Sequence, residues 1–111
     1  MRQIKFRAWD KENGMLDISH WTINMLNENR LPIMQFTGLH DKNGKEIWEG
    51  DVVRWLKYPE TLGQFWWQNH AAYFAIDWSA SKGFYEGNPP IQFSREFEVL
   101  GNIYENPELL K

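Results

Sequence analysis

The amino-acid sequence predicts an all-β protein: a compact, mostly antiparallel barrel or strongly bent sheet that ends in a short C-terminal helix. Two observations lead to this prediction. Short segments in which apolar and polar residues alternate recur along the chain, as they do in strands with one buried face. Turn dipeptides, Asn13-Gly14 and Asn43-Gly44 among them, separate these segments at hairpin spacing. A chain of 111 residues suits one domain, residues 1–111, with a single core.

Composition limits the classes of function. The chain has no cysteine, which excludes disulfides, thiolate metal sites and thiol nucleophiles. Its net charge of −3 argues against general, charge-driven binding of DNA. No stretch approaches the ~18 consecutive apolar residues that a membrane span needs, and residues 1–10 lack the apolar block of a signal peptide. We therefore expect a cytoplasmic protein that does not bind membranes.

Residues 3–9 are the first predicted strand, because their side chains alternate in character. The apolar face of this strand consists of Ile4, Phe6 and Ala8. The outward face would carry two cations and an aromatic ring, those of Lys5, Arg7 and Trp9. Asn13 and Gly14 readily adopt the positive φ angles of a hairpin turn, so residues 15–18 are expected to return as the second strand.

The segment that follows is harder to assign. Residues 19–31 are polar and rich in asparagine, with no clean period, and we expect a loop that carries a short helical turn. Pro32 ends this segment, because proline cannot continue a helix. Residues 33–37 are then expected to form a short strand.

The middle of the chain has the most closely spaced turn residues. Asn43 and Gly44 supply left-handed positions that most residues adopt only at a steric cost. Gly50 permits another reversal, and the carboxylate of Asp51 is expected to cap backbone amides of that turn. Residues 52–56 are rich in β-branched and aromatic types, which predicts a central strand.

Two further strands are expected in the second half. Phe65, Trp66 and Trp67 form an aromatic triplet that must send at least one ring to each face of a strand. Residues 73–78 are a further strand. One face of the triplet needs a cover, which a loop, a second subunit or a partner could provide.

The C-terminal part combines a strand with a short helix. Residues 97–104 alternate with both sets partly apolar, which predicts a strand that is covered on both sides. Asn106, Pro107 and Glu108 match the start of a helix, with asparagine at the N-cap, proline in the first position and an acid in the first turn.

Three blocks of the sequence resemble the YopX family of phage and prophage proteins. They are, in order, MRQIKFRAWDKENGM, IMQFTGLHDKNGKEIWEGDVVRW and FEVLGNIYENPELL. The resemblance implies an all-β fold and an origin in a phage or prophage. It implies no enzymatic activity that could be assigned to residues. Residues 56–96 match no part of the family pattern, so any function specific to this protein is expected to reside there.

Residue types used in enzyme chemistry are present but are not arranged for it. The three histidines, His20, His40 and His70, lie far apart and lack the spacing of metal ligands. His40 and Asp41 are neighbours, but we expect them in a solvated turn. Ser79 and Ser81 lie in a loop without a glycine elbow, and there is no phosphate-binding loop. We therefore expect no enzymatic activity, no catalytic residue, no metal site and no cofactor.

Two candidate binding surfaces remain. The basic-aromatic strand face of Lys5, Arg7 and Trp9 has the combination with which small barrels bind single-stranded nucleic acid; the alternative is a charged face with Trp9 packed against a neighbour. The second candidate is an aromatic surface that consists of Tyr58, Phe65, Trp66, Trp67, His70 and Tyr85. Such a surface fits a contact with a protein or a pocket for a small ring ligand.

The expected function is that of a non-enzymatic accessory protein of a phage or prophage. It would bind a host or phage macromolecule, a protein in the first place, and regulate it or counter host defence. The alternative is a binder of nucleic acid or nucleotide, which would use the basic-aromatic strand face or the aromatic surface. A homo-oligomer fits either function, because a second subunit could cover the exposed ring of the aromatic triplet.

Overall fold

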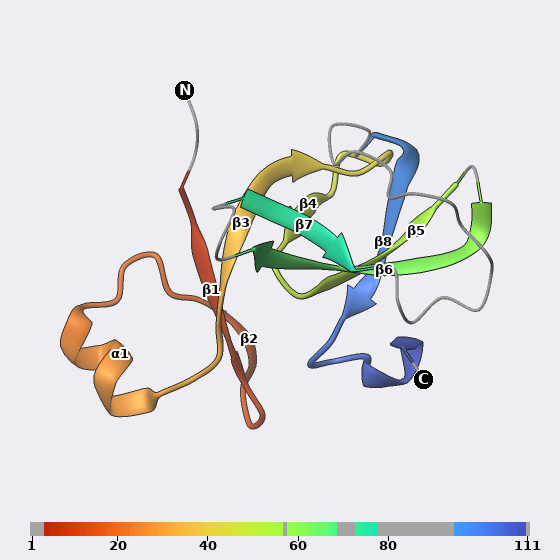
Figure 1. The fold of residues 1–111 in the computed structure, drawn as a ribbon. Helices are drawn as coiled ribbons and strands as arrows, with labels where there is room; N and C mark the ends of the chain where they lie inside the picture. The colour runs from red at the N-terminus through yellow and green to blue at the C-terminus, as the bar shows by residue number, and fades with distance from the viewer. Residues whose placement is uncertain (1–3, 57, 69–72, 78–94, 111) are drawn as a thin grey trace.

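The computed structural model describes residues 4–56, 58–68, 73–77 and 95–110, whose arrangement is shown in Figure 1. Strands dominate, and every strand pair is antiparallel, which confirms the predicted fold class. The elements are, in chain order, β1 (Phe6–Asp10), β2 (Gly14–Asp17), α1 (Ile23–Asn29), β3 (Ile33–His40), β4 (Glu46–Trp48), β5 (Asp51–Trp55), β6 (Tyr58–Gln68), β7 (Tyr73–Asp77), β8 (Phe97–Asn102) and the 3₁₀ helix η2 (Pro107–Leu110).

The strands form two sheets of four. Sheet 1 has the order β2-β1-β3-β4, and sheet 2 has the order β7-β6-β5-β8. The long strands β3 and β6 bend along their length, so the sheets curl into a half-barrel rather than lying flat (Figure 1). The chain passes from one sheet to the other between β4 and β5.

The main core is built mostly by sheet 2, with contributions from β3 and β4 of sheet 1. It consists of Ile47, Val53, Trp55, Phe65, Ile76 and Phe97, with Leu39 and Val99 against it. The rings of Phe65 and Phe97 meet edge to face, with their centroids 6.4 Å apart. Strand β5 lies between β6 and β8, and its valines are fully buried, which confirms the predicted central strand at residues 52–56.

The two hairpin turns each need one left-handed residue, where two had been expected. Gly14 and Gly44 have φ angles of 87° and 80°, but Asn13 and Asn43 do not have positive φ. In the β3–β4 turn the N–H of Gly44 donates to the carbonyl of Asp41 at 3.0 Å. This is the geometry of a three-residue loop, a type I turn followed by a left-handed glycine. The turn positions are confirmed, and the expected conformation of the two asparagines is wrong.

Gly50 makes the reversal between the two sheets, as predicted. Its φ angle is 89°. Its N–H donates to the carbonyl of Phe65 at 2.8 Å, and its carbonyl accepts from the N–H of Ile103 at 2.9 Å. A Cβ at this position would lie 3.4 Å from the sulfur of Met34. The reversal is therefore held by both β6 and the C-terminal segment.

The start of strand β1 departs from the prediction, although Ala8 on the predicted apolar face is buried as expected. Ile4 and Phe6 are 66% and 39% exposed, whereas Ala8 is fully buried. The side chains of Lys5 and Arg7, expected to point outward, are instead half-buried, that of Arg7 being only 15% exposed. Alternation separates the two faces of a strand but does not show which face the rest of the chain will cover.

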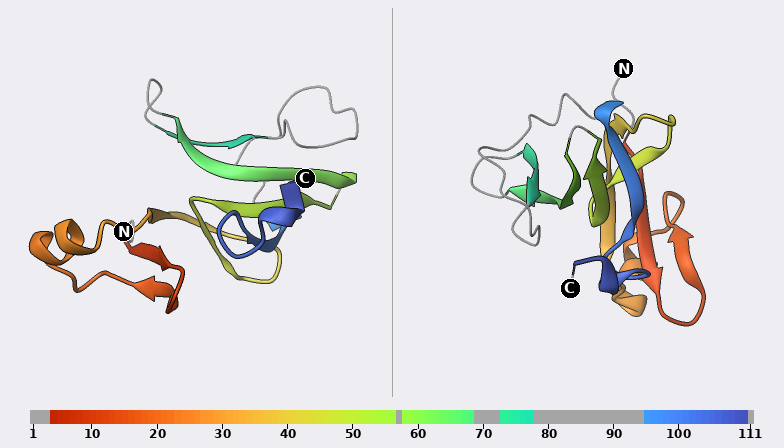
Figure 2. Two further views of the ribbon diagram at one scale, coloured as in Figure 1. Left: turned by 90° about the horizontal axis from the view of Figure 1, so that it is seen from below. Right: turned by 90° about the vertical axis from the view of Figure 1, so that its right-hand side faces the viewer.

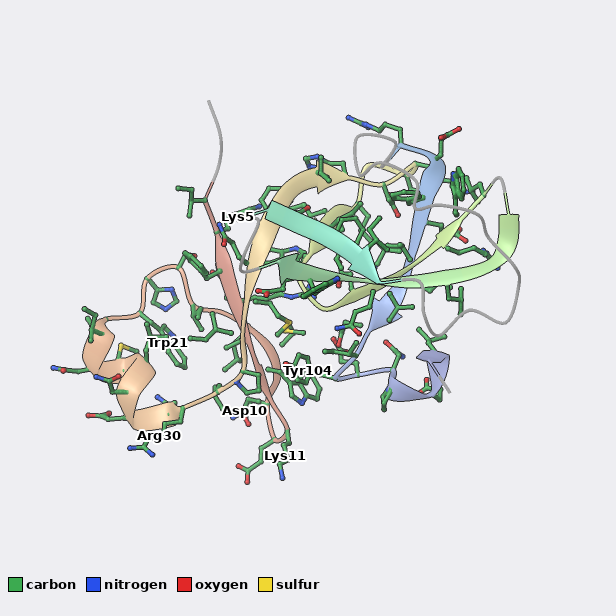
Figure 3. All side chains as sticks on the ribbon, viewed as in Figure 1. Lys5, Asp10, Lys11, Trp21, Arg30 and Tyr104 are labelled. Atoms are coloured by element: carbon green, nitrogen blue, oxygen red, sulfur yellow. The ribbon has the colours of Figure 1, made fainter. Side chains whose placement is uncertain are left out.

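Residues 19–31 contain the expected short helix, α1. The hydroxyl of Thr22 caps it by accepting from the N–H of Met25 at 3.2 Å. The helix ends at Arg30, which has a left-handed backbone with φ of 50°. Figure 3 shows Trp21 on the α1 side of sheet 1 and Tyr104 on the other side.

The C-terminal segment keeps its predicted order but differs in detail. Every residue of β8 is buried or half-buried, in line with a strand covered on both sides. The terminal helix begins at Pro107 as expected. Asn106, the expected N-cap, turns back and accepts from the N–H of Asn102 at 3.3 Å. A Cβ at Gly101 would lie 2.2 Å from that side-chain oxygen, so only glycine allows this contact.

Candidate binding surfaces

The cations of the predicted basic-aromatic strand face gather around Trp48. The ammonium of Lys5 lies 4.7 Å from the centroid of the Phe36 ring and 5.8 Å from that of Trp48. The guanidinium of Arg7 lies 4.9 Å from the Trp48 ring. Both are at cation–π distance. Trp48 is therefore the aromatic ring that Lys5 and Arg7 share, and Phe36 is the ring nearest to Lys5.

Trp9 is separate from this group. Its ring stacks on that of Tyr104, with centroids 6.4 Å apart and planes at 22°. The structure thus brings Lys5 and Arg7 together and leaves Trp9 against a neighbour, which was the alternative interpretation of this residue.

Both cations are also paired with carboxylates. Lys5 bonds to Glu46, and Nη2 of Arg7 donates to Oδ1 of Asp51 at 2.7 Å. The other oxygen of Asp51 accepts from the N–H of Trp48 at 2.8 Å, which confirms that Asp51 caps its turn. Burial raises the pKa of Asp51 above its ordinary value, although the charge of Arg7 and the N–H of Trp48 act in the opposite direction.

These side chains line a pocket of about 270 Å³, the sheet-1 pocket. Its walls come from β2 (Met15, Leu16 and Asp17), from β1 and the residue before it (Lys5 and Arg7), and from β4 (Glu46 and Trp48). Two cations face two carboxylates, so the formal charges of the lining balance. A phosphate would have to displace a carboxylate from each cation, whereas an uncharged group would not.

The predicted aromatic surface is divided by β6. Phe65 is fully buried in the core, and Trp66 is 36% exposed, so the two point to opposite sides, as alternation requires. Phe65 is therefore a core residue. The side chains of Tyr58 and Trp67 on β6, and the whole of His70 and Tyr85, lie outside the described residues.

Trp66 lines a second pocket, of about 200 Å³. Its other walls include Met34, Gly50, Gln64 and Tyr104, so it lies where the two sheets meet the C-terminal segment. Pockets that hold small molecules usually measure about 300–1,000 Å³. Both pockets fall below this range and fit a single side chain better than a nucleotide.

An apolar surface on the outer face of sheet 1 was missed by sequence reasoning. We define it as Ile4, Phe6 and Ile33, which are all exposed. Ile33 pairs with Ala8, and Phe6 lies two residues from Ala8, so both are on one face of the sheet. Ile23 and Met25 on α1 are exposed as well. The alternating residues of β1 were the signal, but Ile4 and Phe6 were taken for buried together with Ala8, and only Ala8 is buried.

Asp41 was expected in a solvated turn, which is wrong: it is only 1% exposed. One oxygen accepts from the N–H groups of Asn43 and Lys45 at 2.8 and 2.9 Å, and the other accepts from the N–H of Val99 at 2.9 Å. Burial raises the pKa of Asp41, but these three hydrogen bonds outweigh it and hold the pKa below the ordinary value of 3.8. Asp41 thus ties the β3–β4 turn to β8.

The described residues contain neither a cluster of metal-ligating side chains nor a membrane-spanning helix. No three histidine or acidic side chains lie close enough together to hold a metal ion there. No helix in the same part of the chain has the length and apolar character needed to cross a membrane. His40 packs its ring edge against Phe36, with centroids 5.7 Å apart.

Comparisons with known proteins agree with this fold. The family model of the YopX protein matches residues 17–111. The chain is similar to the crystal structure of protein EF1440 from Enterococcus faecalis, with a TM-score of 0.62, 23% sequence identity and 100% of both chains covered. Likeness at this identity shows the fold alone. No curated protein matches the chain.

Proposed function

This chain belongs to the YopX family, and from that premise we propose that it is a non-enzymatic accessory protein of a phage or prophage. It acts in the cytoplasm of the bacterial host by binding a protein of the host or the phage. The apolar surface carries this proposal, because Ile4, Phe6 and Ile33 are exposed on one face of a small domain that has a closed core elsewhere. Grouped apolar side chains on a surface mark contact sites.

The alternative, binding of nucleic acid or nucleotide, has less support from the same geometry. Lys5 and Arg7 are each engaged by a carboxylate and an aromatic ring, so neither offers a free charge to a phosphate. The chain carries a net charge of −3, which repels a polyanion. The two pockets are also smaller than a nucleotide requires.

Affinity capture from a host lysate, with and without nuclease, tests the proposal. The variant Phe6→Ser combined with Ile33→Ser removes two members of the apolar surface. Leu56→Ser, which changes an exposed apolar residue next to sheet 2, is the matched control. All three residues are exposed, so we expect the variants to melt close to the parent.

We expect the parent and the control to capture the same proteins, with or without nuclease. The double variant should lose these proteins. Capture that disappears with nuclease would favour the nucleic-acid function instead. Equal capture by the double variant and the control would remove the apolar surface from the contact.

A further inference from the structure

Among the described strands, none pairs with the outer edge of β2. Strand β2 ends sheet 1, and both views of Figure 2 place it at the margin of the molecule. The N–H of Ile18 donates to the carbonyl of Phe6, so Leu16 and Ile18 bond toward β1. Because backbone groups alternate along an antiparallel strand, those of Met15 and Asp17 point away from it. Within the described parts of the chain, these outward groups have no hydrogen-bond partner.

The end strand β8 of sheet 2 is covered in contrast. The N–H of Lys42 donates to the carbonyl of Phe97 at 2.9 Å, and the N–H of Val99 donates to Asp41. The β3–β4 turn therefore occupies two backbone groups of β8, the carbonyl of Phe97 and the N–H of Val99. An open strand edge is a template for another strand, and proteins cover edges where such pairing is unwanted. This chain covers β8 and leaves β2 open.

The sheet-1 pocket lies beside this open edge. Asp17 pairs with Arg7 across the two strands, so both point to the face that carries the pocket. A strand added along β2 would send alternate side chains to the same face. The balanced charges of the lining, the ring of Trp48 and the apolar side chain of Met15 favour an uncharged apolar side chain there.

We propose that the outer edge of β2 takes up an extended peptide segment of the partner as a fifth strand of sheet 1. A large, uncharged apolar side chain of that segment enters the sheet-1 pocket beside Met15 and Trp48. Main-chain hydrogen bonds supply affinity and the pocket supplies side-chain preference, as in other cases of strand addition. The inference rests on the proposed function, because it names the part of the protein partner that binds.

Two substitutions of Asp17 distinguish the contribution of its backbone N–H to binding from that of its side chain. Asp17→Pro removes an N–H that points outward and leaves the ladder to β1 in place, as proline does on edge strands. Asp17→Ala removes the same carboxylate, and its bond to Ser19, but keeps the N–H. The probe is a library of short random peptides selected on the immobilised full chain. Enriched peptides are synthesised, and their affinities are measured by fluorescence anisotropy.

We expect enriched peptides with apolar residues at alternate positions. They should bind Asp17→Pro at least about tenfold more weakly than Asp17→Ala, a loss of about 1.4 kcal/mol. Both variants lack the carboxylate that lines the sheet-1 pocket, so the difference between them reports the backbone N–H. Amide hydrogen exchange, measured by NMR on the parent, should slow at Met15 and Asp17 in the complex. This second readout does not depend on the folding of Asp17→Pro.

Several outcomes would overturn the proposal. Among them are equal affinities of Asp17→Pro and Asp17→Ala, unchanged exchange at Met15 and Asp17, and a selection that enriches no peptide over an unrelated acidic protein. Self-association that Asp17→Pro abolishes would place a second copy of the chain on the edge instead. If Asp17→Pro captures the cellular partner as the parent does while the Phe6 and Ile33 double variant does not, the β2 proposal fails alone. If both variants capture it normally, the proposed function fails as well.

Discussion

Sheet 1 and sheet 2 bury their apolar side chains to different extents. In sheet 2, Val53, Phe65 and Phe97 are fully buried and share one core. In sheet 1, β1 leaves Phe6 exposed and turns Arg7 inward. Sheet 2 supplies most of the main core, whereas sheet 1, which also buries Met34, Phe36 and Ile47, presents an apolar surface and an open edge.

The inner side of sheet 1 combines ion pairs with the buried apolar side chains of Met34 and Phe36. Arg7 bonds to the buried Asp51 and lies over Trp48, and Lys5 bonds to Glu46. Buried ion pairs add little net stability, but removal of one partner leaves an uncompensated charge. This network therefore fixes how β1 lies against the β4–β5 turn more than it stabilises the protein.

The largest expected effect is the difference in stability cost between a phenylalanine of sheet 2 and one of sheet 1, each replaced by alanine. Phe65→Ala should lower the free energy of unfolding by about 3–5 kcal/mol, because it opens a cavity in the core of sheet 2. Phe6→Ala should cost less than about 1 kcal/mol, since its ring is already in contact with water. Urea unfolding followed by tryptophan fluorescence measures both. Equal losses of unfolding free energy in the two variants would contradict the difference between the sheets.

A smaller effect is expected at the covered edge of sheet 2. Asp41→Ala removes a buried carboxylate that accepts from three backbone N–H groups and should cost about 2–3 kcal/mol. Because the pKa of Asp41 is lowered by folding, its contribution is present above pH 3.8 and is lost as the pH falls through the folded value.

The variant Asp41→Asn does not titrate and is the control for pH. The difference in unfolding free energy between the parent and this variant should stay constant well above pH 3.8 and shrink below it. Urea titrations at a series of pH values give this difference. A difference that does not change with pH would mean that the Asp41 carboxylate is not what ties the turn to β8.

The turns and the central strand could be predicted because they depend on neighbouring residues. Gly44 and Gly50 have the positive φ angles that their turns require, and Asp51 caps the residue three positions before it. Strand β5 contains the β-branched and aromatic residues that favour a buried strand. Each of these features is determined within a few positions of the sequence.

The candidate surfaces could not be predicted because they depend on distant contacts. Asp41 was assigned to a solvated turn, but Val99, its partner on β8, is 58 residues away. Arg7 points inward because it pairs with Asp51, which lies 44 residues further along the chain. Alternation in β1 correctly divided the side chains between two faces, but it could not show which of them the rest of the chain would cover.

Mapping the contact by NMR tests most directly whether sheet 1 is the binding surface. The nitrogen-labelled protein is titrated with a partner that the parent captures and the Phe6 and Ile33 double variant does not. We predict amide shift changes around Phe6, Met15, Asp17 and Ile33, with β5 unchanged. Changes confined to β5–β8, with sheet 1 unaffected, would contradict the account.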